Sequence, residues 1–107
     1  MGYINEEKLS QILEEHKRWI CTNKKEGKRA DLSDANLSDA NLSGANLNYA
    51  KLSSTNLSGA NLTQVKNLSI NKLSTVKSLY KAKLDPKLMK QVEDKYPHFL
   101  EEPKSEE

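Results

Sequence analysis

The chain has few side chains of the types that perform catalysis, and they lie far apart in the sequence. It contains two histidines, His16 and His98, and one cysteine, Cys21. A cysteine nucleophile needs a base that activates its thiol, and no base is adjacent to Cys21 in the sequence. We therefore expect a buried or half-buried, inert thiol. His16 falls on the apolar face of an expected helix, so we interpret it as a packed histidine rather than a ligand or general base.

Four glutamates near the start of the chain, Glu6, Glu7, Glu14 and Glu15, could suggest paired carboxylates for acid–base catalysis. On a helix they instead form its solvated side. The sequence has no glycine-rich phosphate loop, no nucleophile elbow and no His or Cys set with metal-ligand spacing. We therefore predict no catalytic, cofactor-binding or metal-binding residues, and we predict that the protein is not an enzyme.

The regular feature of the chain is a repeating pentad. Seven leucines occur at a period of five, and a small residue lies two positions before each one. The leucines are Leu32, Leu37, Leu42, Leu47, Leu52, Leu57 and Leu62, and the small residues are Ala30, Ala35, Ala40, Ala45, Ala50, Thr55 and Ala60. Asn, Asp or Lys separates the two positions and Ser, Asn or Thr follows the leucine, so the unit reads A-(N/D)-L-S-x.

A period of five fits neither an α-helix nor a flat strand. If each pentad forms one side of a square coil, residue i lies over residue i+20 at about 4.8 Å. The leucines and the alanines then point inward together and form the structural core. We expect Asp31 over Lys51 as an exposed ion pair, asparagine amides that hydrogen-bond from coil to coil, and a Thr55 hydroxyl bound to a backbone group.

The A-(N/D)-L-S-x run over residues 30–64 is similar to that of the pentapeptide-repeat proteins. The resemblance implies an all-β solenoid, a short right-handed quadrilateral β-helix, which we place at residues 30–84. A further coil continues beyond the run through Val65, Leu68, Leu73, Val76, Leu79, Ala82 and Leu84. Because Leu68 comes one residue late, we expect an insertion and a wider or partly helical corner around residues 69–73.

A short β-helix presents unpaired backbone groups at both ends, and these need a cover. Before the repeats we predict a capping helix at 5–22, with Asn5 as its N-cap. Its apolar stripe is expected to lie over the first coil, and it consists of Leu9, Ile12, Leu13, His16, Trp19 and Ile20. The segment from His16 to Ala30 also resembles the leader that precedes the repeats in small members of the family.

After the repeats we predict a second capping helix at 86–95. Asp85 and Pro86 suit the N-cap and the first helical position, and Pro97 lies just beyond the end. This helix is expected to cover the last coil with Leu88 and Val92. Residues 101–107 are expected to form a mobile charged tail, and the whole chain, 1–107, to be one domain.

Composition limits the function classes that we expect. The formal charge is +2, from 17 basic and 15 acidic residues, which does not suit a dedicated nucleic-acid binder. The basic cluster Lys24, Lys25, Lys28 and Arg29 is accordingly interpreted as a solvated turn. A single cysteine fits a reducing compartment, and no apolar run approaches the roughly 20 residues that span a bilayer. We expect a cytoplasmic protein, not associated with membranes.

We predict a structural or protein-interaction module that binds an unidentified protein and is a monomer, with a dimer as the alternative. Tyr49 occupies a variable outward position among small or polar neighbours, and an exposed tyrosine on a rigid face can anchor a partner. We take Tyr49, Lys51 and Asp31 as the candidate partner-binding surface.

The family resemblance also implies an alternative function, because some members are acidic rods that imitate DNA and modulate DNA gyrase. Duplex DNA carries a charge about every 1.7 Å. Residues 30–64 carry three aspartates, Asp31, Asp34 and Asp39, against Lys51, a net charge of −2. Fewer than three coils also give a length of only about 15 Å. We therefore rank DNA mimicry second.

Overall fold

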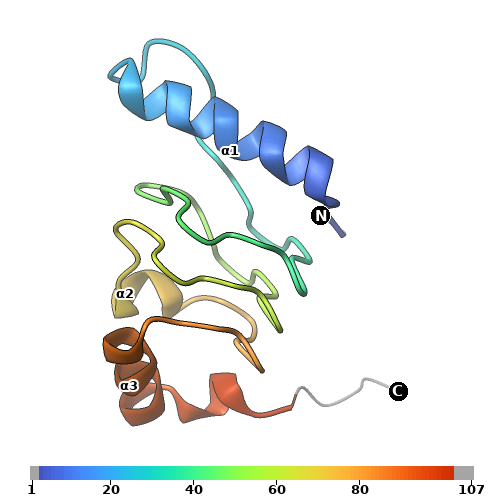
Figure 1. The fold of residues 1–107 in the computed structure, drawn as a ribbon, viewed down its shortest axis with the longest axis vertical. Helices are drawn as coiled ribbons and strands as arrows, with labels where there is room; N and C mark the ends of the chain where they lie inside the picture. The colour runs from blue at the N-terminus through green and yellow to red at the C-terminus, as the bar shows by residue number, and fades with distance from the viewer. Residues whose placement is uncertain (1–2, 103–107) are drawn as a thin grey trace.

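The repeats form a stack of coils that lies between helical segments at its two ends (Figure 1). The computed structural model describes residues 3–102. Helix α1 (Glu6–Cys21) crosses one end of the stack, and α3 (Pro86–Lys95) and the 3₁₀ helix η1 (Pro97–Leu100) lie at the other. The short helix α2 (Ile70–Leu73) forms a corner of the last coil.

Parallel β-bridges join successive coils at the second residue of each pentad. They connect each residue to the one four pentads later, as the sequence predicts: Asp31 to Lys51, Asn36 to Asn56, Asn41 to Asn61 and Asn46 to Lys66. At the first of these, the Leu32 amide donates to the Lys51 carbonyl at 2.9 Å and the Lys51 amide donates to the Ala30 carbonyl at 3.0 Å. Every bridge within residues 3–102 is isolated, so these coils pair at single residues rather than along the continuous strands of an all-β fold.

A tight turn after each leucine explains why the strands do not extend. The fifth residue of every pentad adopts a left-handed conformation, with φ between 59° and 72°. The Asn or Asp side chain at the second position accepts the amide two residues later, as Asn36 Oδ1 does from Ser38 at 3.0 Å. The same bond recurs at Asp31, Asn41, Asn46, Asn56 and Asn61. The asparagines thus close their own turns, and the predicted amide bonds between coils are wrong for these side chains.

The leucines fill the axis of the stack, and each of the seven is at most 3% exposed. Ala30, Ala35, Ala50 and Ala60 are also buried, whereas Ala40 and Ala45 are only partly buried. Ala45 lines a hollow between α1 and the first coil, because the helix does not cover this side closely. The buried Thr55 hydroxyl donates to the Leu32 carbonyl at 2.8 Å, the kind of partner expected for it.

The register changes after the second coil. Asn56 bridges to Ser78 and Asn61 bridges to Lys83, so each partner lies two positions later than the five-residue period would place it. The two additional residues lie in a corner that contains α2. This helix begins after the N-cap Ser69, and its last residue, Leu73, is buried in the core. The predicted insertion and helical corner are therefore confirmed.

The first coil is covered by two segments. Helix α1 begins after Asn5, whose side chain accepts the Lys8 amide at 2.8 Å, and it corresponds to the segment predicted at 5–22. Ahead of the helix, Tyr3 pairs with Asn36, and the Ile4 amide donates to the Asn36 carbonyl at 3.2 Å. This short edge pairing, with Ile4 buried, is absent from the sequence-based expectations.

The last coil is covered by α3 and η1. Val92 of α3 is fully buried and Leu88 is partly buried. Asp85 precedes α3, but its carboxylate accepts the Gln64 amide, at 3.0 and 3.1 Å, and makes no capping bond to the helix. The expected side-chain cap is therefore wrong. The Phe99 carbonyl in η1 accepts the Leu79 amide at 2.9 Å. In the expected tail, residues 101–102 are exposed and 103–107 lie outside the described residues.

Candidate functional site

The three residues predicted as a partner-binding surface lie near the passage from the first coil to the second. Asp31 and Lys51 are exposed and form a backbone bridge, and Tyr49 is 53% exposed. The expected Asp31–Lys51 ion pair is wrong, because both ion pairs within residues 3–102 are made by Arg18. Hydrogen bonds from Ser33 lower the pKa of the Asp31 carboxyl, with smaller contributions from the charges of Lys51 and Arg29.

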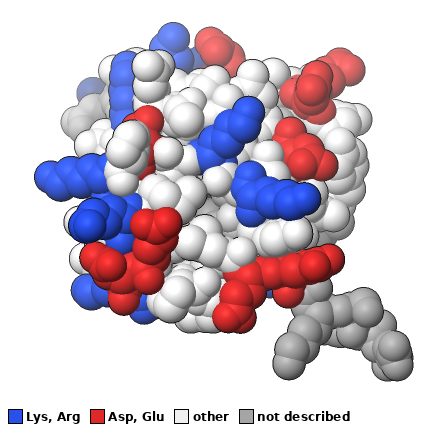
Figure 2. Space-filling model, turned by 60° about the horizontal axis from the view of Figure 1, so that its bottom comes forward, with Lys and Arg blue, Asp and Glu red and all other residues white. Residues whose placement is uncertain are grey.

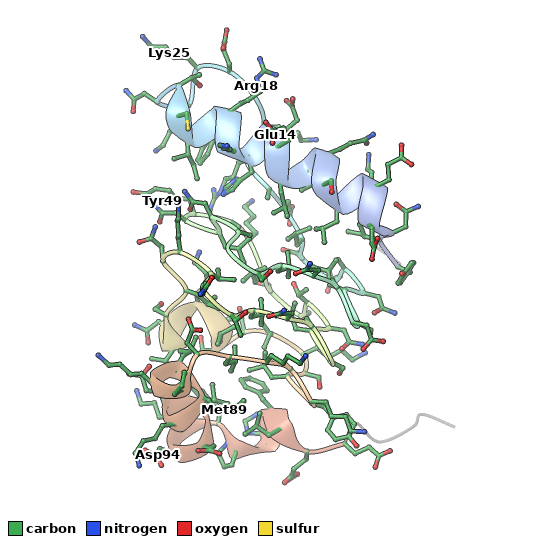
Figure 3. The ribbon with its side chains drawn as sticks, in the orientation of Figure 1. Glu14, Arg18, Lys25, Tyr49, Met89 and Asp94 are labelled. Carbon is green, nitrogen blue, oxygen red and sulfur yellow. The ribbon has the colours of Figure 1, made fainter. Side chains whose placement is uncertain are left out.

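Tyr49 packs against the end of α1 and the loop that follows it (Figure 3). Its ring meets Trp19 edge to face, with 6.2 Å between the centroids and 79° between the planes. The Lys24 ammonium lies 5.3 Å from the Tyr49 ring and 5.5 Å from the Trp19 ring, within the range of a cation–π interaction. Tyr49 is therefore part of a cluster of two aromatic rings and one cation.

The backbone of Tyr49 is strained. Its φ is 67°, whereas the equivalent position elsewhere holds Asp34, Asp39, Gly44, Ser54, Gly59 or Gln64. A bulky residue in the left-handed region is uncommon, and its backbone conformation lowers the stability of the fold by about 1 kcal/mol or more. A small or polar residue would meet the needs of the turn, so the tyrosine side chain is not explained by the fold alone.

Two further cations bind backbone groups at this corner. Arg29 Nε donates to the Tyr49 carbonyl at 2.6 Å, and Lys72 Nζ donates to the Ala50 carbonyl at 3.1 Å. Burial lowers the pKa of the Lys72 ammonium, and the charge of Arg29 lowers it further. Sequence reasoning missed this arrangement, because Lys72 reaches Ala50 from α2, across an irregular corner.

His16 joins α1 to the first coil beneath this cluster. It is fully buried and stacks on Trp19, with 5.8 Å between the ring centroids. Its Nδ1 accepts the Ala30 amide at 2.9 Å, and its Nε2 lies 2.8 Å from the Asn48 carbonyl. Because Nδ1 accepts a hydrogen bond and a carbonyl cannot donate one, these contacts require the neutral tautomer with the proton on Nε2. Burial lowers the pKa of His16, although the Asn48 carbonyl opposes this effect.

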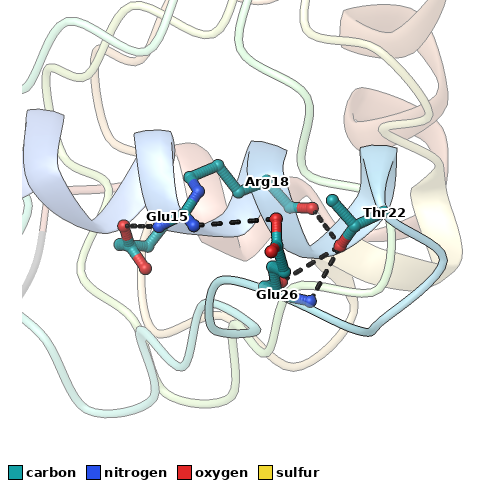
Figure 4. Close-up of polar contacts among 4 residues, drawn as sticks. All are labelled: Glu15, Arg18, Thr22 and Glu26. Atoms are coloured by element: carbon teal, nitrogen blue, oxygen red, sulfur yellow. Dashed lines mark hydrogen bonds and ion pairs between the residues drawn. The ribbon is translucent and has the colours of Figure 1, made fainter.

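The loop between α1 and the first coil is fixed by polar contacts (Figure 4). The Thr22 hydroxyl donates to the Arg18 carbonyl at 2.7 Å and accepts the Glu26 amide at 2.9 Å. The Arg18 guanidinium pairs with Glu15 at 2.9 Å and with Glu26 at 3.8 Å. These contacts hold the loop that places Lys24, and they engage two carboxylates that could otherwise pair with cations nearby.

The remaining candidates for chemistry are separated in space. Cys21 ends α1 and is exposed, so the expectation of a buried or half-buried thiol is wrong. His98 is exposed in η1 at the opposite end of the stack. Residues 3–102 contain no group of three or more His, Cys, Asp or Glu side chains that could hold a metal ion. No helix in the same range has both the length and the apolar character needed to span a bilayer.

Part of the chain is similar to a known protein family. Residues 28–64 match the family model for pentapeptide repeats in eight copies. The match ends shortly before the corner that contains α2, where the regular register between coils is lost. Comparisons with curated proteins and with solved structures find no match to the chain. Residues 28–64 are therefore a run of pentapeptide repeats.

Proposed function

We propose that this protein is a non-catalytic interaction module that binds a partner protein through the corner at Tyr49. The observation that carries the proposal is the exposed tyrosine in a left-handed turn, braced by Trp19 and Lys24. Aromatic side chains held in place lose little conformational entropy when they are buried in an interface. Lys51 and Asp31 flank this anchor and complete the surface.

The scaffold behind this surface is proposed to be a short right-handed quadrilateral β-helix. Bridges that recur once per pentad and join residues four pentads apart support four sides per coil. Buried leucines at every side support a rigid frame, because close-packed interiors resist deformation.

We propose that the module acts as a monomer in the cytoplasm. Support for a monomer comes from the segments that occupy the two stack ends, Tyr3 and Ile4 at one and Phe99 at the other. Support for the cytoplasm comes from Cys21, because an exposed unpaired thiol suits a reducing compartment. Light scattering coupled to size-exclusion chromatography should give the mass of one chain; a dimer mass at micromolar concentration would refute this part of the proposal.

DNA mimicry of the gyrase-modulating type stays the second candidate, and the charge distribution gives it little support. Viewed with the α3 end forward, the surface mixes basic and acidic side chains (Figure 2). The cations at the Tyr49 corner would also repel a basic DNA-binding groove. Inhibition of DNA supercoiling by the purified protein would move this candidate to first place.

Affinity capture with a matched pair of variants tests the proposal. The immobilised protein, Tyr49→Gly and Ser54→Gly would each be exposed to the same cell lysate. Both substitutions fall on the fifth pentad position, where glycine occurs at Gly44 and Gly59 with φ of 71° and 72°, so both should fold. A protein enriched by the wild type and by Ser54→Gly but lost with Tyr49→Gly would support the proposal. Equal enrichment by all three would contradict it.

A further inference from the structure

We propose that the Tyr49 corner recognises an acidic segment of its partner, rich in Asp and Glu. This inference rests on the proposed function and specifies the chemistry of the partner. The residues concerned, which we call the basic corner, are Lys24, Arg29 and Lys72 around the rings of Trp19 and Tyr49.

The fold assembles the basic corner from three separate segments. Lys24 comes from the loop after α1, Arg29 from the start of the repeats and Lys72 from α2. Arg29 and Lys72 bind the consecutive carbonyls of Tyr49 and Ala50, so their charges are held close together. Each also disfavours a further positive charge nearby, since both lower the pKa of the buried His16.

Within residues 3–102, no carboxylate forms an ion pair with these three cations. The ion pairs in that range join Arg18 to Glu15 and to Glu26. Asp31 is close enough for Arg29 to lower its pKa, but its carboxylate accepts the Ser33 amide at 3.0 Å and pairs with no cation. Like charges held together repel one another, and an incoming carboxylate would relieve that repulsion while gaining charge-assisted hydrogen bonds.

The aromatic rings favour a protein segment over a nucleic acid. Tyr49 and Trp19 place apolar surface beside the Lys24 cation, and interfaces between proteins are enriched in aromatic residues and arginine. Duplex DNA binding commonly uses about 6 to 10 phosphate contacts, more than three cations supply.

Fluorescence anisotropy with defined probes tests this inference on the full chain. The probes are a labelled Glu- and Asp-rich peptide with one leucine, the same peptide with Gln and Asn in place of the acids, and a labelled DNA duplex. We expect the acidic peptide to bind at low salt, to bind more weakly at high salt, and to bind more tightly than both other probes. Equal binding of the neutral peptide, or tighter binding of DNA, would overturn the inference.

Variants locate the binding and separate it from loss of folding. Lys24→Gln, Arg29→Gln and Lys72→Gln should each weaken acidic-peptide binding about fivefold, and Tyr49→Gly about tenfold. The Lys24 side chain contacts the two rings and makes no hydrogen bond or ion pair within residues 3–102, so its variant should keep a melting temperature close to that of the wild type even if Arg29→Gln and Lys72→Gln lower theirs. Lys90→Gln, an exposed position in α3, is the control and should bind like the wild type.

The same variants distinguish failure of this inference from failure of the proposed function. If Tyr49→Gly abolishes capture of a cellular protein while folded Lys24→Gln, Arg29→Gln and Lys72→Gln retain it, the interaction module stands and the acidic partner is refuted. If none of the four changes capture or peptide binding, both proposals are refuted.

Discussion

At the scale of single residues, one side chain of α1 satisfies backbone groups of the first coil that have no preceding coil to bind. Inside the stack, the Ser53 carbonyl accepts the Asp34 amide of the preceding coil at 2.9 Å. Asn48 holds the same pentad position in the first coil, and the His16 Nε2 supplies that donor instead. His16 Nδ1 also accepts the Ala30 amide. One neutral imidazole thus replaces a donor and an acceptor of a missing coil.

Stability should fall at acidic pH because of His16. Protonation of Nδ1 removes the acceptor for the Ala30 amide. The pKa of His16 lies below its ordinary value of 6.5 in the folded protein, so the unfolded chain binds more protons, and the free energy of unfolding decreases as pH falls from 6.5 through the lowered pKa. Urea unfolding at about pH 7.5 and about pH 5 would measure the difference.

The two histidines allow a matched control for this pH dependence. His98→Gln alters an exposed residue and should keep the wild-type difference between the two pH values. His16→Gln should reduce it, and a His16→Gln difference equal to that of the wild type would contradict the role of His16. The depressed pKa of Asp31 affects stability only as pH falls below its ordinary value of 3.8, so it does not interfere at about pH 5.

At the scale of elements, each end of the stack is closed by a segment that supplies backbone hydrogen bonds as well as apolar cover. At the first coil, Ile4 donates to Asn36 and the loop after α1 returns the chain to Ala30. At the last coil, η1 presents the Phe99 carbonyl to Leu79 and buries the Phe99 side chain. The stability of the stack therefore depends on elements outside the repeats.

Gly27 in the loop after α1 should not tolerate a side chain. Its φ is 78°, and a Cβ would meet the Glu15 carbonyl oxygen, the Trp19 amide nitrogen at 2.7 Å and Arg18 Cβ at 2.8 Å. Gly27→Ala should lower the free energy of unfolding by about 2–4 kcal/mol, from strain and overpacking together. Gly44 has a similar φ of 71°, but a Cβ there would meet open space. Gly44→Ala should therefore lower the free energy of unfolding by only about 1 kcal/mol. Equal losses in chemical denaturation would show that the loop does not pack tightly on α1.

Removal of the Phe99 side chain should destabilise the last coil. Phe99 is 7% exposed. We expect Phe99→Ala to lower the free energy of unfolding by about 3 kcal/mol, because the cavity leaves Leu79 and its neighbours without packing partners. Lys90→Ala, at an exposed position of α3, should stay within about 0.5 kcal/mol of the wild type. Thermal unfolding of the two variants gives the comparison, and similar small shifts for both would exclude η1 as a cover.

At the scale of the whole molecule, a chain of 107 residues buries one narrow core and leaves few edges open. Open edges with unpaired backbone groups favour association between copies. Tyr3 and Ile4, which make only a short pairing, therefore contribute to the assembly state as well as to stability.

Opening the edge at Asn36 should cause self-association. Ile4→Pro removes the amide that donates to the Asn36 carbonyl and also shortens a buried side chain, so it should lower the free energy of unfolding by about 2–4 kcal/mol. Sedimentation velocity should then show an average mass that rises with protein concentration. Tyr3→Ser changes a side chain that is 68% exposed and keeps the backbone bond, so it should behave like the wild type. A concentration-independent monomer mass for Ile4→Pro would rule out this protective role.

The stack could be predicted from the sequence because its core depends only on spacing. Alanine and leucine recur at fixed positions, so the sequence predicts that each residue pairs with the one four pentads later. The late Leu68 likewise predicts where this regular pairing changes. The covers at Ile4 and Phe99 follow no repeat. They depend on contacts with Asn36 and Leu79, which no local pattern in the sequence indicates.

The site was only partly predictable for the same reason. Tyr49 stood out because its pentad position is variable, but its neighbours Trp19, Lys24 and Lys72 come together only in the fold. The Asp31–Lys51 ion pair failed because a nearer donor, the Ser33 amide, satisfies the Asp31 carboxylate. Side-chain partners at this corner are decided by local turns, which the backbone register does not specify.

The pairing of residues four pentads apart, with one bridge per pentad, also fixes the angle between the two ends of the protein. In the proposed four-sided coil, each pentad between α1 and α2 advances the chain by one side, so one added pentad would turn the α3 end by about a quarter revolution relative to α1. Four added pentads would restore the original angle and lengthen the axis by about 4.8 Å. Changes in repeat number can therefore reorient or extend the molecule in discrete steps while both end covers keep their own contacts.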